Sequence, residues 1–329
     1  MAIKQRGAAL VIVLFIVALA ATIAADMAVN LMVQVQKTTN IQQHQQSKWY
    51  AYATEELAKK VLVEVKKQDK EQVNLSQVWA TENEPYPVDG GYLKVKLTDL
   101  RACLNLNALA QPPAAQDNKS SEGQNPAHRA LLHLLQNIEE LNNEESEEAL
   151  ADSVYDWLDE DNITYRSGAE EDDYMANRTP YMTANNLFAA VSELRVVKGF
   201  NPLVMEKLLP YVCVIPGNTE LILNVNTLQP EQAMLITALA PGVSQAGAEA
   251  ALAARPEKGF EKVSDFIEEL KKQGAKDVQT LDKVFTVNSN YFQLVAVAFF
   301  NERRFTMTST LAVKDGQVTV LARKFGGVQ

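Results

Sequence analysis

The amino-acid sequence predicts an α+β fold, in which one long N-terminal helix packs on an antiparallel sheet and a large α-helical domain is inserted into that sheet. Three observations lead to this prediction. Residues 8–84 contain neither glycine nor proline, the two strongest helix breakers. β-rich runs occur once early, at residues 92–100, and again near the end, at residues 284–325. The long stretch between them carries helical patterns.

The N-terminal helix is expected to cover residues 8–67, and its first part is apolar enough to cross a membrane. The run Ala8–Ala25 has 18 residues and no charge, which is about the shortest helix that spans a bilayer. Lys4 and Arg6 precede it and place the N-terminus in the cytoplasm by the positive-inside rule. Apolar residues at three- and four-residue steps continue the helix as an amphipathic one: Trp49, Ala53, Leu57, Val61 and Val65. A signal peptide cleaved near residues 21–25 is the alternative.

The two β-rich parts are expected to form one sheet. Residues 82–100 predict a turn at Gly90–Gly91 followed by a single strand. Residues 284–325 predict three strands, with an Asp-Gly hairpin turn in "KDGQ" (314–317) and a second turn in "NERR" (301–304). The simplest topology joins residues 68–102 and 286–329 in one domain. Three sequential domains are the alternative.

The inserted helical domain is expected to cover residues 103–285 in two parts. The first part, 103–215, includes expected helices at residues 127–142, 183–197 and 201–212. The second part, 224–285, resembles small helical domains of the helix-hairpin-helix or SAM-like type. Such hairpins sometimes bind DNA, but this part carries nine acidic and seven basic residues and no basic stripe. DNA binding requires phosphate neutralisation, so we expect packing against protein and no nucleic acid.

Cysteine is scarce, with only Cys103 and Cys213 in the chain. They lie near the two ends of the first helical part. An exported chain meets an oxidising compartment, which favours a disulfide between them. Such a bond would close a long loop and stabilise the fold by roughly 4–5 kcal/mol in the chain-entropy model. Two buried free thiols are the alternative.

The strongest charge feature is an acidic tract from Glu139 to Asp173, with fifteen carboxylates and one basic residue, Arg166. Carboxylates this close repel one another unless a cation neutralises them, and oxygen ligands favour Ca²⁺. The spacing imitates an EF-hand only in part, because Ile163 and Thr164 stand where a ligand and the invariant glycine belong. We therefore expect a different calcium loop that holds one or two ions; a merely solvated acidic loop is the alternative. The candidate ligands are Asp159, Asp161, Glu170 and Glu171, followed by Asp156 and Asp173.

Signs of catalysis and of a basic binding surface are absent from the sequence. There is no H-E-x-x-H motif, P-loop or G-x-S-x-G motif. The net charge is −10, which argues against binding nucleic acid or anionic lipid through a basic face. We expect no enzymatic activity.

The N-terminus resembles the processing signal of type IV pilins and type II secretion pseudopilins, in which a basic leader ends in glycine before an apolar helix. The resemblance implies that a prepilin peptidase removes residues 1–7 by cutting between Gly7 and Ala8, and that the processed protein is methylated. Most pilins carry a glutamate at the fifth mature position, where this chain has Ile12. That carboxylate pairs with the N-terminal amine of a neighbouring subunit, and a buried charge is tolerable only when it is paired.

An ordered set of further motifs identifies the chain as a member of the GspK family, the K-type minor pseudopilins. The set is "CLNLNAL", "ADSVYDWLDEDN", "SGAEEDDY", "PYMTANNL", "SELRVVKG" and "NVNT". The resemblance implies a pilin-like fold with an inserted, calcium-binding α-domain. It also implies an inner-membrane protein whose C-terminal domain lies in the periplasm. Where the family usually has Gly-Ala-Glu-Asp, this chain has Glu171 in place of the aspartate.

The resemblance further implies a role at the tip of the type II secretion pseudopilus, where the chain would initiate or cap the filament and support export of folded proteins. The implied partners are the I and J types, the H type as a further candidate, the major pseudopilin, the prepilin peptidase and the inner-membrane assembly platform. Two other functions stay open on the sequence alone. One is a soluble periplasmic calcium-binding protein with a cleaved signal peptide, and the other is a pilin-like protein of DNA uptake.

Overall fold

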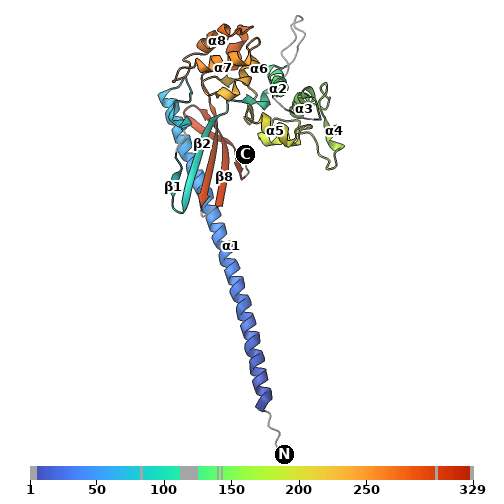
Figure 1. Cartoon of the computed structure of the whole chain (residues 1–329), viewed down its shortest axis with the longest axis vertical. Coiled ribbons are helices and arrows are strands. Elements are labelled where there is room, and N and C mark those ends of the chain that lie inside the picture. Colours follow the sequence, from blue (N-terminus) through green and yellow to red (C-terminus); the bar gives the residue numbers. More distant parts are fainter. Residues whose placement is uncertain are drawn as a thin grey trace, which may run out of the picture.

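The computed structural model describes residues 6–81, 84–111, 125–138, 141, 144–300 and 303–326. It has the predicted α+β architecture, with a long helix, an antiparallel sheet and a helical insertion (Figure 1). Most of the expected leader 1–7 and the first half of the "NERR" turn lie outside the described residues.

Helix α1 spans Arg6–Gln68, about 95 Å at 1.5 Å per residue. No glycine or proline interrupts it after Gly7, which agrees with the predicted single helix. Its first half extends away from the rest of the molecule (Figure 1) and exposes its apolar side chains. Among the described helices it alone is long and apolar enough to cross a membrane. It therefore suggests a single-pass anchor that carries the remainder of the chain as a separate folded part.

The sheet has five antiparallel strands in the order β1-β2-β7-β8-β9. The prediction of a single early strand was incomplete, because a short strand β1 precedes the turn and pairs with β2. Gly90 turns the chain with φ +82°, and a side chain on Gly91 would collide with the carbonyl oxygen of Phe299. The "KDGQ" hairpin is confirmed between β8 and β9. The strands are β1 (Tyr86–Val88), β2 (Gly91–Asp99), β7 (Tyr291–Phe300), β8 (Arg303–Lys314) and β9 (Gln317–Phe325).

The face of α1 that packs on the sheet coincides only in part with the apolar stripe of the sequence pattern, since Val61 and Val65 of that stripe pack on the sheet core. Ala51, Ala58 and Leu62 are buried against β7 and β8. Trp49 and Leu57 instead point outward, 70% and 53% exposed. Alanine at the contact lets the helix axis lie close to the strands, so helical periodicity located an apolar stripe without identifying which face meets the sheet.

One polar cluster stabilises the contact between α1 and the sheet. Glu55 is 1% exposed. Its carboxylate accepts two hydrogen bonds from the Arg323 guanidinium of β9, both 2.8 Å, and one from the Ser309 hydroxyl of β8 at 2.6 Å. Burial alone would raise the pKa of Glu55, but the bonds from Arg323 and Ser309 outweigh it and lower the pKa to about 2.

The helical insertion lies between β2 and β7 and covers the end of the sheet opposite the free part of α1 (Figure 1). Its first half begins and ends at a two-stranded parallel pair, β3 (Leu104–Asn105) with β4 (Val212–Cys213). Its second half does so at β5 (Leu223–Asn224) with β6 (Phe285–Thr286). A single hydrophobic core runs through both halves.

The helices of the insertion are short. In the first half they are α2 (Pro126–Asn137), α3 (Glu147–Leu158), α4 (Glu171–Met175) and α5 (Pro202–Leu208). In the second half they are α6 (Met234–Leu239), α7 (Gln245–Ala253), α8 (Val263–Lys272) and α9 (Leu281–Val284). Single 3₁₀ turns occur at Val78–Ala80, Leu106–Ala110, Val191–Val196, Pro230–Gln232 and Val278–Thr280.

The α-helix expected at residues 183–197 was wrong, because only the 3₁₀ turn Val191–Val196 forms there. Asn185 has a left-handed backbone with φ 44°. The backbone N–H and carbonyl of Phe188 are bonded to the side chain of Asn107. These tertiary bonds use backbone groups that a helix would need.

Asp99 joins the sheet to the insertion at the end of β2. It is fully buried and accepts hydrogen bonds from the Arg101 N–H, the Asn224 amide and the Thr227 hydroxyl, at 2.7–2.9 Å. Asn224 also donates to the carbonyl of Val73. The polar residues of "NVNT" therefore hold the insertion in a defined orientation on the sheet.

Candidate functional site

The acidic loop is held between α3 and α4, the two helices that carry its candidate ligands. The Ser146 side chain caps the start of α3 by accepting the N–H of Ala149. Asp156 lies in the last turn of α3, and Asp159 is the residue that ends it. Glu170 is the residue that precedes the first turn of α4. The two helix ends therefore bring residues eleven to fourteen positions apart in the chain to one place.

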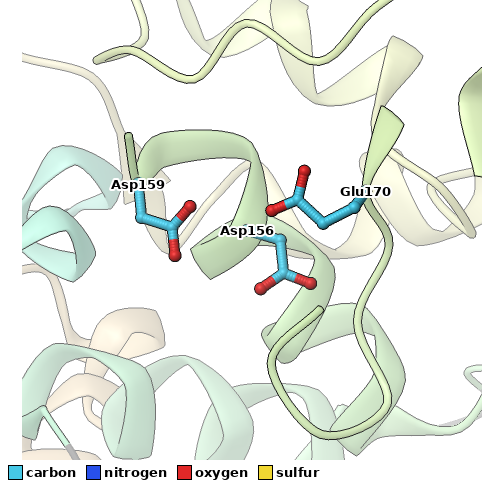
Figure 2. Close-up of side chains that lie close together, drawn as sticks. All are labelled: Asp156, Asp159 and Glu170. Carbon is cyan, nitrogen blue, oxygen red and sulfur yellow. The ribbon is translucent and has the colours of Figure 1, made fainter. Parts of the chain in front are cut away.

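Three of the six candidate ligands converge. One carboxylate oxygen of Asp156, one of Asp159 and one of Glu170 all lie within 4.8 Å of each other. Figure 2 shows Asp159 and Glu170 reaching toward each other from the two helix ends, with Asp156 between them. Asp156 and Glu170 are almost completely buried, and Asp159 is half-buried. We call these three residues the carboxylate cluster.

The carboxylate cluster has few donors of its own. The Tyr165 N–H reaches both oxygens of Asp156, at 3.0 and 3.2 Å. Oδ1 of Asp159 and both carboxylate oxygens of Glu170 are buried without a hydrogen-bond donor among the described residues. Buried charged oxygens without partners are strongly unfavourable, so a missing positive group is the simplest physical account of their arrangement.

The raised pKa values of the carboxylate cluster reflect the same unfavourable burial of negative charge. Burial raises the pKa of Asp156 to about 8, and the charges of Glu170 and Asp159 add to the shift. Burial also raises the pKa of Glu170 to about 7 and that of Asp159 to about 6, again assisted by neighbouring carboxylates. A divalent cation among the three would remove both causes, because it replaces water as the partner of the negative charge.

The loop between the helices is fitted closely around Asp156. A Cβ on Gly168 would lie 2.1 Å from Oδ2 of Asp156, so a larger residue there would displace the carboxylate. One turn earlier on α3, Asp152 accepts the Ser167 N–H at 3.2 Å and pairs with Nε2 of the buried His128 at 2.8 Å. Asp152 and Asp156 therefore hold the loop through its backbone, and α2 supports that arrangement through His128.

The other three candidate ligands lie outside the carboxylate cluster. Asp161 is exposed and accepts the Ile163 N–H at 2.8 Å. Glu171 is half-buried in the first turn of α4. Asp173 accepts the Glu170 N–H and pairs with Lys198 at 2.8 Å. The bond from Lys198 lowers the pKa of Asp173. A carboxylate that already has a cationic partner has less need of a metal ion, so Asp173 stays a predicted ligand that this geometry does not favour.

Sequence reasoning did not select three residues that shape this site. In the sequence, Gly168 stands out only as part of the motif "SGAEEDDY", and Asp152 only as one carboxylate of the acidic tract. Asn185 donates to the carbonyl of Asp161 at 3.0 Å, while its own Oδ1 is buried without a partner among the described residues. The sequence feature that could have indicated Asn185 is the polar "ANN" in a motif expected to be helical, because asparagine side chains are unfavourable in a helix interior.

The remaining predicted positions are placed as follows. The structure joins Cys103 and Cys213 in a disulfide beside the β3–β4 pair. Gly7 and Ala8 lie within the first turns of α1. Ile12 is 59% exposed on the apolar part of α1, where none of the described residues covers it.

The carboxylate cluster fits a hard cation by its chemistry. Its donors are all oxygens, which Ca²⁺ prefers, and the separation of the ligand atoms is compatible with oxygens bound at 2.3–2.6 Å around one ion. With one oxygen from each residue, three carboxylates supply half or fewer of the six to eight ligands that Ca²⁺ takes. Backbone carbonyls and water would have to supply the rest.

Comparisons with known proteins identify relatives along the whole chain. Sequence models described as "Type II secretion system (T2SS), protein K" match residues 102–217 and 223–288. The chain is 34% identical to type II secretion system protein K of Aeromonas hydrophila, over 99% of this chain and 98% of that protein. It is 33% identical to the protein of the same name from Klebsiella pneumoniae, over 98% and 97%.

A solved structure is similar as well. A chain in the crystal structure of the GspK-GspI-GspJ complex from the enterotoxigenic Escherichia coli type 2 secretion system matches with a TM-score of 0.76 and 32% identity. The match covers 89% of this chain and 100% of that one. Sequence and structure agree over nearly the full length, and this chain therefore belongs to the type II secretion system protein K family.

Proposed function

We propose that the chain is the K-type minor pseudopilin at the tip of a type II secretion pseudopilus, where it initiates or caps the filament and supports export of folded proteins. The observation that carries this proposal is the position of the insertion. It covers the end of the sheet opposite the apolar part of α1 (Figure 1). In a filament of parallel α1 helices, this bulk lies where the next subunit would have to pack, so the chain can begin a filament but not extend it.

The apolar part of α1 serves this role in two stages. It first anchors the protein in the inner membrane, with the folded part in the periplasm, and then joins the helical core of the filament. Cleavage between Gly7 and Ala8 by a prepilin peptidase would leave the helix intact, with methylation of the processed protein. Ile12 supports a position at the tip, since a subunit with none above it has no amine for a carboxylate to pair with.

The partners follow from the relatives and from the exposed side of α1. The similar solved chain comes from a complex of GspK with GspI and GspJ. We propose I- and J-type pseudopilins as partners of this chain. The H type, the major pseudopilin and the assembly platform are proposed as further partners during assembly of the filament. Trp49 and Leu57 supply an exposed apolar stripe on α1 above the membrane segment, which suits packing against another helix. Full coverage by K-family relatives disfavours both a soluble calcium-binding protein and a DNA-uptake protein.

The tip position is tested by electron microscopy of pseudopili assembled with an epitope-tagged full-length chain. We expect gold label at one end of each filament. Label along the shaft would contradict the steric argument. Sequencing the N-terminus of the membrane-bound protein tests the processing separately. A start at Ala8 is expected, whereas a start near Asp26 would indicate a conventional signal peptide.

We further propose that the carboxylate cluster binds calcium as a structural ion. One ion at Asp156, Asp159 and Glu170 is supported by the buried oxygens that lack donors. A second ion would have to use Asp161 or Glu171, which lie nearby but outside the carboxylate cluster. The ion would join the end of α3 to the start of α4, so it would stabilise the loop between them and the surface that this loop forms.

Thermal melts of the detergent-solubilised full-length chain test the ion. A ligand present at 100 times its dissociation constant stabilises by about 2.7 kcal/mol, which raises the Tm by about 5–10 °C for an insertion of this size. We expect this rise with Ca²⁺ relative to EGTA and a smaller one with Mg²⁺, which keeps its waters. Asp156→Asn should abolish the rise, and Asp172→Asn, on the exposed side of α4, should keep it. Equal melting points in Ca²⁺ and EGTA would count against a structural ion.

A further inference from the structure

A groove lined by cations lies between α1 and the start of β8. Two adjacent open cavities form it, with volumes of about 300 and about 380 Å³, and they share His44, Arg304 and Phe305. The groove lies at the end of the sheet nearest the free part of α1, since Arg303 contacts Asn40 whereas the later residue Ser309 contacts Glu55. We call it the basic groove, and its principal lining residues are His44, Lys48, Arg303, Arg304, Phe305 and Phe325.

The charge of the basic groove is opposite to that of the chain. The protein carries a net charge of −10, yet none of the described residues that line the groove is acidic. The described partners of its cations are neutral. Arg303 donates to the side-chain oxygen of Asn40 at 2.8 Å, and the Lys48 ammonium lies over the rings of Tyr52 and Phe325. Three permanent cations with no carboxylate among the described lining residues repel one another, so an anionic occupant would be favoured.

The floor of the basic groove is apolar. Phe305 is buried at its base, with the His44 ring edge-on at 5.2 Å, and Phe325 is partly exposed at its rim. An occupant with both carboxylates and an apolar side chain would use the whole surface. An isolated small anion would use only the cations.

The height of the basic groove above the membrane distinguishes a protein occupant from a lipid. His44 lies nineteen positions after Ala25, the end of the apolar run, which is about 29 Å along the helix. The headgroup layer extends only about 5–8 Å beyond the hydrocarbon. A helix tilt of about 20° shortens the height by less than a tenth. The remaining gap of about 20 Å is more than twice the Debye length at physiological salt, about 8 Å.

We infer that the basic groove receives an acidic segment of a neighbouring pseudopilin subunit, with carboxylates at Arg303 and Arg304 and an apolar side chain against Phe325. A subunit anchored in the same membrane or filament by its own N-terminal helix can present a segment at this height, which a lipid cannot reach. This inference rests on the proposed function, and it identifies which surface of the sheet meets the subunit below the tip.

Binding of the full-length chain to purified I- and J-type pseudopilins in nanodiscs tests the inference. The test variant is Arg303→Glu with Arg304→Glu. The matched control is Lys94→Glu with Lys96→Glu, two exposed lysines of β2 that give the same change of net charge. We expect the Kd for at least one partner to rise about tenfold in the test variant, with a weaker dependence on salt, and to stay within about twofold in the control. A third variant, Arg303→Gln with Arg304→Gln, should give an intermediate Kd, and circular dichroism verifies folding.

Different outcomes overturn different claims. A wild-type chain that binds neither partner would overturn the proposed function and this inference with it. Binding by the wild type that the groove variants share, with the same Kd and salt dependence, would overturn the inference alone. The nanodiscs are made once from phosphatidylcholine and once with added phosphatidylglycerol. A loss of binding seen only with the anionic lipid would assign the groove to a membrane surface and would also overturn the inference.

Discussion

Replacing Glu55 by glutamine removes the charge that joins α1 to the sheet while keeping the size of the side chain. In the wild type the carboxylate accepts three hydrogen bonds from Arg323 and Ser309, and Lys59 lies 3.3 Å away. The pKa of Glu55 is lowered from 4.5 to about 2 despite its burial. By linkage this shift corresponds to about 3 kcal/mol. Arg323 is more than a third exposed, so screening by water reduces the expected loss to about 2 kcal/mol.

The dependence on pH has a definite sign. The folded pKa of Glu55 lies below its unfolded value, so its stabilising contribution is complete above about pH 4.5 and is lost as the pH falls through about 2. Urea denaturation of the full-length chain in detergent, followed by near-ultraviolet circular dichroism, measures the free energy of unfolding. The gap between wild type and Glu55→Gln should be about 2 kcal/mol at pH 7 and should close toward pH 2.

A neighbouring residue provides the control. Glu56 is mostly exposed and pairs with Lys59 alone among its described partners, so Glu56→Gln should cost less than about 0.5 kcal/mol. The reasoning is refuted if Glu55→Gln is as stable as the wild type at pH 7, or if the gap does not change between pH 7 and pH 3.

Three further predictions concern the insertion and the membrane helix. Gly168→Ala should weaken calcium binding, as measured by titration calorimetry, because its Cβ would lie 2.1 Å from Oδ2 of Asp156; an unchanged affinity would show that the ligands do not include Asp156. Cys103→Ser or Cys213→Ser should lower the stability by about 5 kcal/mol in the chain-entropy model, because the bond closes a loop with a sequence separation of 110, and an equal loss on reduction of the wild type would confirm the cause. Ile12→Glu should be tolerated in the filament core without producing long filaments, since the insertion still blocks elongation; long filaments built from this variant in electron micrographs would contradict the steric argument.

Much of the architecture could be predicted because its signals are local. The absence of glycine and proline after Gly7 specifies one helix, and the pair Asp315–Gly316 specifies a hairpin, since both central residues of that turn need positive φ. The short strand β1 was not predicted, because three residues that include a proline are too few to show the two-residue alternation of a strand. The expected helix at 183–197 failed because its backbone groups are used by Asn107, a residue about eighty positions earlier.

The sequence by itself determined the long apolar helix, the order of strands and helices, and the acidic composition of the loop, because each depends on residues close together in the chain. Only the tertiary structure decided which carboxylates converge. Asp173 faces Lys198, whereas Asp156, Asp159 and Glu170 meet where two helix ends approach each other. Only the tertiary structure, too, selected the alanine face of α1 for the sheet and left Trp49 exposed. Both choices depend on close packing and charge pairing between segments far apart in sequence, which no local pattern encodes.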